Sequence, residues 1–134
     1  MKHFKTVLYC LIILAGTGFI LTPETLADKS KVKIEAPSGA VMGEEVVIVL
    51  HIFHEGNNFI HYTRQVNLFI NDKPAKQWKH SRFDRPEKEN FSVSFSHTAM
   101  ENLKIKAEAF CNIHGSEGAA IKTIAVTADQ SSSQ

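Results

Sequence analysis

Apolar and polar residues alternate over several stretches of this chain. The clearest is "FSVSFSH" at residues 91–97, where two phenylalanines and a valine share one face and three serines share the other. The stretch "LKIKAEAFC" at 103–111 repeats the pattern, and its apolar face ends at Cys111. A period of two predicts strands with one buried face, and no long stretch has helical spacing.

Further strands are predicted from β-branched residues and from the turns between them. The segments are "KVKIEA" at 31–36, "EEVVIVLHIF" at 44–53, "YTRQVNLFIN" at 62–71 and "AIKTIAVTA" at 120–128. The nearly continuous apolar run at 44–53 predicts burial on both faces. The stretch "NDKPAKQWKH" predicts a turn and then a solvated strand, because Pro74 cannot pair in a central strand. About seven short strands in about a hundred residues predict an all-β fold, an immunoglobulin-like antiparallel β-sandwich.

The N-terminus has the order of a secretory signal peptide. A basic start, "MKHFK", precedes an apolar run at 6–21 and the small residues of "TPETLA". We therefore predict a signal peptide at residues 1–27, cleaved after Ala27, and export to the periplasm. The alternative is an uncleaved helix that anchors the chain in the membrane, although the apolar run is short for a bilayer span. Cys10 follows a tyrosine rather than a small residue, so it is not predicted to carry a lipid.

The rest of the chain is predicted to be one domain, residues 28–128, followed by a disordered polar tail at 129–134. Cleavage lowers the count of Lys plus Arg from 15 to 13, and that of Asp plus Glu from 14 to 13. The mature chain is then neutral apart from its histidines. This argues against nucleic acid as a partner, because nucleic acid requires clustered positive charge.

Cys111 is the one cysteine left after cleavage. Exported proteins usually carry cysteines in even numbers, as disulfides. A lone thiol in an oxidising compartment therefore has to be buried or bound. Three interpretations are open at this point: an inert core residue, a nucleophile and a metal ligand.

The chain contains seven histidines, many for its length, and four of them have structural interpretations. His3 leaves with the signal peptide. His80 lies in a charged stretch and is predicted to be solvent-exposed, whereas His97 is predicted to be a satisfied residue at a strand edge. His51 lies within an apolar strand and is predicted to be a hydrogen-bonded core residue.

The remaining histidines lie close to strand ends. His54 and His61 bracket the loop "EGNNFI" between two predicted strands. At the end of a third strand, "CNIHG" places Cys111 three positions before His114, and Gly115 lets the backbone turn away. Loops at one end of a sandwich can bring such residues together. A thiolate with imidazoles suits zinc, copper or iron, so these residues are a candidate metal site.

These segments resemble a known family. "HEGNNFIHYTRQVNLFI", followed far downstream by "AFCNIHG", is similar to the iron-binding domain of the superoxide reductases, the desulfoferrodoxin and neelaredoxin family. "KIEAP" and "VMGEE" also resemble the family's lead-in and following turn, so the resemblance spans about residues 28–127. It implies a seven-stranded immunoglobulin-like fold. It also implies one iron with four equatorial histidines, an axial cysteine and an open sixth position.

The resemblance implies a role for each candidate ligand. His54, His61 and His114 match three equatorial histidines, and Cys111 matches the axial thiolate. The family's His-Pro-Asn is replaced here by "HEG", and the loop is one residue longer, which makes His51 the substitute candidate for His54.

The main departure from the family lies at the start of the domain. Where the family has Glu-Lys-His, this chain has Asp28, Lys29 and Ser30. The fourth histidine is therefore missing, and water, Ser30 or another group is expected in its place. Lys29 matches the family's lysine that attracts superoxide, so the resemblance implies a catalytic role for it.

Two functions remain open. The favoured one is an exported superoxide reductase-type oxidoreductase, in which mononuclear non-haem iron converts superoxide to hydrogen peroxide with electrons from an external donor protein. The alternative is an exported, non-catalytic domain of the same fold that holds iron, copper or zinc. The family's dimers and larger assemblies also imply a homo-oligomer. A blue-copper site is disfavoured because no methionine follows His114.

Overall fold

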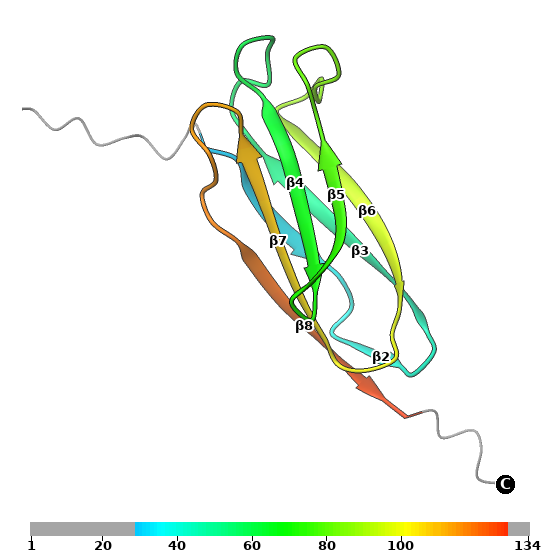
Figure 1. Ribbon diagram of the computed structural model, residues 1–134. Coiled ribbons are helices and arrows are strands. Elements are labelled where there is room, and N and C mark those ends of the chain that lie inside the picture. The colour runs from blue at the N-terminus through cyan, green and yellow to red at the C-terminus, as the bar shows by residue number, and fades with distance from the viewer. Residues whose placement is uncertain (1–28, 129–134) are drawn as a thin grey trace, which may run out of the picture.

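The computed structural model describes residues 29–128, which fold into two packed β-sheets (Figure 1). The signal peptide predicted at 1–27 and the tail predicted at 129–134 lie outside these residues. Within 29–128, no helix has the length and hydropathy needed to cross a membrane.

One sheet has three strands and the other has five. The first contains, in spatial order, β1 (Lys31–Glu35), β3 (Glu45–Phe53) and β6 (Asn90–Thr98). The second contains, in spatial order, β2 (Gly39–Val41), β8 (Ala120–Thr127), β7 (Leu103–Cys111), β4 (Thr63–Ile70) and β5 (Lys73–Lys79). The prediction of an all-β, immunoglobulin-like sandwich is confirmed.

Two of the strands show what the sequence pattern could and could not reveal. β5 lies at the edge of its sheet, as Pro74 requires, and follows a tight turn in which Asn71 and Asp72 have φ of 50° and 62°. β2 was not predicted, because its three residues are too few to show a period. It pairs in parallel with β8, whereas the other paired strands of the two sheets are antiparallel.

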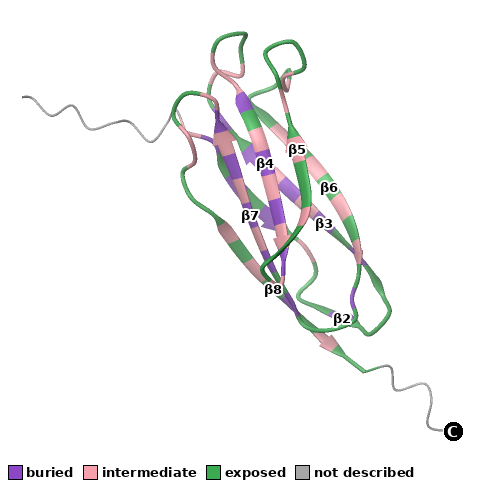
Figure 2. Cartoon of the chain, in the orientation of Figure 1, coloured by how far each residue is buried: buried purple, intermediate pink, exposed green. Residues whose placement is uncertain are grey.

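The core lies between the two sheets and follows the predicted alternation along β7. Buried residues recur at every second position of this strand and end at Cys111 (Figure 2). The prediction that 44–53 is buried on both faces is wrong. Val46, Ile48 and Leu50 are buried, but the intervening Val47 is 50% exposed. Valine favours strands on either face, so its presence does not report burial.

His51 lies on the outer face of the three-stranded sheet. Its Nδ1 is 2.9 Å from Ser92 Oγ, and its Nε2 is 2.8 Å from Glu35 Oε2. The predicted hydrogen bonding is confirmed, but the predicted core position is wrong, because the inward positions of β3 are the alternate ones. On this face the His51 ring cannot substitute for His54.

The other two histidines assigned structural places also lie on β-strands or beside them. His97 stacks on Phe95 near the end of β6, with ring centroids 6.4 Å apart. His80 was expected to be exposed but is only partly so. Its ring meets Phe91 edge-on at 5.7 Å, and its Nε2 is buried without a hydrogen-bond partner among the described residues. Its backbone N–H donates to Arg64 O at 2.8 Å, which holds His80 against the sheet.

Three strand ends meet at one end of the sandwich (Figure 1). β3 ends just before His54, β4 begins just after His61, and β7 ends at Cys111. β4 and β7 are antiparallel neighbours, with Thr63 opposite Cys111. The topology therefore brings residues that are more than fifty positions apart in the chain to the same place.

Candidate metal centre

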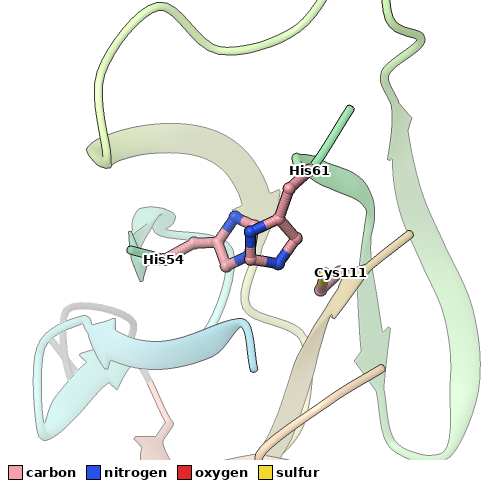
Figure 3. A group of neighbouring side chains, drawn as sticks. All are labelled: His54, His61 and Cys111. Carbon is pink, nitrogen blue, oxygen red and sulfur yellow. The ribbon is translucent and has the colours of Figure 1, made fainter. Parts of the chain in front are cut away.

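His54, His61 and Cys111 form a compact group of metal-binding side chains (Figure 3). One ligand atom from each residue lies within 4.8 Å of the others. His54 and Cys111 are buried, whereas His61 is partly exposed. Cys111 forms no disulfide, so its sulfur is available as a thiolate ligand.

A third imidazole, that of His114, lies beside this group. Its Nδ1 lies 3.1 Å from His61 Nε2 and 3.9 Å from Cys111 Sγ. The structure thus brings three of the four residues that the sequence nominated as ligands into one group and places the fourth, His114, against two of them.

Two pairs of ring nitrogens, both of which include His61 Nε2, have the spacing of atoms that bind the same ion. His54 Nε2 and His61 Nε2 are 3.1 Å apart, as are His61 Nε2 and His114 Nδ1. Metal–nitrogen bonds of about 2.1 Å at angles between 90° and tetrahedral separate two nitrogens by about 3.0 to 3.4 Å. The three rings meet edge-on, with interplanar angles of 78° and 84°, so their nitrogens converge without the rings stacking.

The turn after β7 directs backbone donors at the sulfur. The N–H groups of Ile113 and His114 donate to Cys111 Sγ at 3.3 Å and 3.4 Å. Cys111 N–H donates to Gly115 O at 2.8 Å, and Gly115 has φ of 77°, which closes the turn. N–H donors stabilise negative charge on sulfur and tune a thiolate-bound metal. The spacing of "CNIHG" therefore places Cys111 and His114 in one closed turn and directs two N–H groups at the sulfur.

Asparagines hold the two ligand-bearing loops, and the sequence analysis assigned them no role. Asn58 Oδ1 accepts the backbone N–H groups of Ile60 at 2.9 Å and His61 at 2.8 Å. Asn112 Oδ1 accepts Tyr62 N–H, and its Nδ2 donates to Ile60 O, both at 2.8 Å. Short amide side chains commonly bond nearby backbone in loops, so the asparagines beside the candidate ligands, Asn57, Asn58 and Asn112, were the available signal.

Ser30 does not lie in the ligand group. Its side chain is fully buried, and its Oγ lies 3.0 Å from Thr63 Oγ1. His51, His80 and His97 have their ring contacts elsewhere in the sandwich. Within the described residues, the candidate centre therefore has two imidazoles and one thiolate, and the His114 imidazole lies beside them.

Lys29 lies beside the centre rather than in it. It lines a polar hollow of about 340 Å³ next to His54, together with Lys31. Three carboxylates also line this hollow: Glu55, Glu89 and Glu117. Lys31 Nζ is paired with Glu117 Oε1 at 2.9 Å. The hollow therefore has both positive and negative side chains close to His54, a buried candidate ligand.

Comparisons with known proteins were made for the sequence and for the fold. The family model described as Desulfoferrodoxin matches residues 24–117, which is more than half of the chain. No curated protein sequence matches.

Several solved structures share the fold. A superoxide reductase (neelaredoxin) from Ignicoccus hospitalis has a TM-score of 0.63 at 21% identity, covering 74% of this chain and 82% of its own. A variant of the superoxide reductase (neelaredoxin) from Archaeoglobus fulgidus has a TM-score of 0.55 at 17% identity, covering 78% and 96%. A CARDB domain from Pyrococcus furiosus, in complex with di-metal ions, has a TM-score of 0.57 at 17% identity, covering 78% and 99%. At such identities these likenesses show the fold alone.

Proposed function

The chain belongs to the desulfoferrodoxin family, and from this premise we propose that it is a mononuclear non-haem iron protein that reduces superoxide to hydrogen peroxide. The observation that carries the proposal is the convergence of two imidazoles and one thiolate sulfur at one end of the sandwich, with the His114 imidazole next to them. His54 and His61 would bind iron through Nε2, His114 through Nδ1 and Cys111 through Sγ. Imidazole and thiolate are ligands that suit iron.

Bound iron would supply the redox chemistry: one electron and two protons convert one superoxide into one hydrogen peroxide, and an external donor protein returns the electron. The chain's own groups would prepare the site for this. The two backbone N–H groups that donate to Cys111 Sγ would hold the sulfur in place as a ligand. His114 is exposed and His61 partly so, which leaves an approach from solvent for a small anion.

Lys29 is proposed to attract superoxide. It lines the hollow next to His54, where a positive charge raises the encounter rate of an anion. Lys31 lines the same hollow, but its charge is paired with Glu117. We therefore assign the attraction of superoxide to Lys29, which has no ion pair within residues 29–128. We also propose that residues 1–27 export the chain to the periplasm.

A second candidate function rests on the position of Ser30. Because its hydroxyl is buried against Thr63, it supplies no ligand, and the centre has at most four protein donors when His114 is counted. Four nitrogen and sulfur donors are the number that zinc uses in closed structural sites. This observation favours a non-catalytic domain that holds zinc, copper or iron.

One experiment separates the two functions. The mature domain is purified, its metal content is measured, and the reduced protein is mixed with superoxide. Superoxide reduction predicts bound iron and one peroxide formed for each superoxide consumed. Oxygen evolution with half that peroxide yield would indicate dismutation. Zinc or copper at full occupancy, with no superoxide consumed, would establish the non-catalytic function instead.

A further inference from the structure

The orientation of the Asn57 side chain is determined by two backbone groups. Its Oδ1 lies 2.8 Å from the backbone N of Thr63, and its Nδ2 lies 2.8 Å from Lys88 O. A backbone N–H can only donate, and a backbone carbonyl can only accept. The amide oxygen of Asn57 must therefore face Thr63, and its NH₂ group must face Lys88.

This orientation determines which nitrogen of His54 carries a proton. His54 Nδ1 lies 2.9 Å from the same Asn57 Oδ1, which can only accept. Nδ1 must therefore be protonated. The lone pair of the neutral ring is then on Nε2, which points at His61 Nε2 from 3.1 Å inside the candidate centre. One asparagine thus selects the tautomer that can bind metal there.

Thr63 supplies its N–H from a buried position that pairs with Cys111. It is fully buried at the start of β4, where the pairing with β7 shifts register between Thr63 and Gln65. Such a bulge redirects a side chain, and Thr63 Oγ1 points at Ser30 Oγ, 3.0 Å away. Ser30 is held in turn, since its carbonyl accepts Glu117 N–H at 3.0 Å. Ser30, at the start of the domain, thereby supports the first residue of β4, and this residue orients Asn57.

We propose that Asn57 is a positioning residue, which fixes the His54 ring as an Nε2 ligand, and that the Ser30–Thr63 hydroxyl pair supports the fold beneath it. This inference rests on the proposed metal centre but not on superoxide chemistry. Groups that hydrogen-bond a ligand histidine fix its orientation and raise its basicity, and their loss typically lowers metal affinity about 10- to 100-fold.

The test combines two measurements on the metal-free and Co²⁺-loaded domain. Nitrogen NMR of the imidazole rings reports the His54 tautomer, and optical titration with Co²⁺ reports affinity through its thiolate and imidazole absorption. In the unaltered chain, His54 should be protonated at Nδ1. Asn57→Ala should give a mixture of tautomers and weaken Co²⁺ binding by about 10- to 100-fold.

Thr63→Val is the matched control, because it removes a buried hydroxyl beside Asn57 but keeps the N–H that orients the amide. It should lower stability and leave the His54 tautomer unchanged. If Asn57→Ala does not fold, Asn57→Asp tests the same point, since a carboxylate oxygen still accepts from Nδ1 and should keep the tautomer. An unchanged tautomer and affinity in folded Asn57→Ala would overturn the inference. Loss of superoxide reduction alone, with Co²⁺ binding intact, would count against the proposed function and not against Asn57.

Discussion

The hydroxyl groups of Ser30 and Thr63 lie 3.0 Å apart in a fully buried hydrogen bond beside the candidate metal centre. The bond joins the first described residues of the domain to the start of β4. Family resemblance assigned the position of Ser30 to a ligand histidine. Here the position has a packing role, and the ligand set is smaller by one.

The first prediction concerns that pair. Ser30→Ala leaves the Thr63 hydroxyl buried without its partner, so the free energy of unfolding should fall by about 1–3 kcal/mol. Thr63→Val should cost a similar amount for the same reason. The double variant should be more stable than the sum of the single losses predicts, since neither hydroxyl is then left unpaired. Chemical denaturation of all four proteins measures the coupling; strict additivity would mean that the bond contributes nothing.

The second prediction concerns the ligands. Cys111→Ala and His114→Ala should each abolish stoichiometric metal binding or weaken it severely, because each removes one of the four proposed donors. His51→Ala is the matched control, since its ring lies on the outer sheet face with Ser92 and Glu35. Metal analysis of the purified variants is the measurement. Full occupancy in both ligand variants would show that the metal binds elsewhere.

The third prediction concerns electrostatic attraction of superoxide. Lys29→Ala should lower the second-order rate with superoxide by about three- to ten-fold, and the rate should lose part of its dependence on ionic strength. Lys33→Ala removes the same charge from the same end of the chain, but its exposed side chain does not line the hollow beside His54. Pulse radiolysis at several salt concentrations compares the two. Equal rate losses in both variants would show that the rate depends on the net charge of the protein and not on the position of Lys29.

The fourth prediction concerns the turn that carries two ligands. Gly115 has φ of 77°, a conformation that costs a residue with a Cβ about 1–2 kcal/mol. Since a Cβ there would meet no neighbouring atom, Gly115→Ala tests backbone strain without a steric clash. We expect lower stability together with weaker metal binding, because the N–H groups of Ile113 and His114 would no longer point at Cys111 Sγ. Gly39→Ala is the control, because Gly39 lies in β2, far in the chain from the turn that carries Gly115, and does not have a positive φ. Unchanged metal affinity in Gly115→Ala would show that the turn can relax without disturbing the ligands.

The fifth prediction concerns export. Expression with residues 1–27 intact should yield a periplasmic protein that begins at Asp28, as measured by intact mass. Replacing Ala27 by a bulky residue should block this cleavage, because the site requires small side chains. A membrane-bound product of full mass from the unaltered chain would instead support the uncleaved anchor.

Much of the fold could be predicted because alternation is a local property. The burial of β7 at every second residue follows directly from its sequence, and so does the end of its apolar face at Cys111. β3 was misjudged on one face, since its valines fit a strand whether or not they are covered. β2 was missed because a three-residue strand exists only through its pairing with β8.

The candidate site divides in the same way. Local spacing was enough to nominate Cys111 and His114, because one tight turn after β7 carries both. His54 and His61 could be nominated from their loop, but their convergence with Cys111 depends on which strands are neighbours. The roles of Ser30 and Asn57 depend on partners that are 33 and 31 positions away in the chain. By itself the sequence determined the strands, the turn and the types of ligand, since these arise from neighbours along the backbone. Only the tertiary structure decided the number of ligands that meet and the group that orients His54, because hydrogen bonds and metal coordination depend on distances through space.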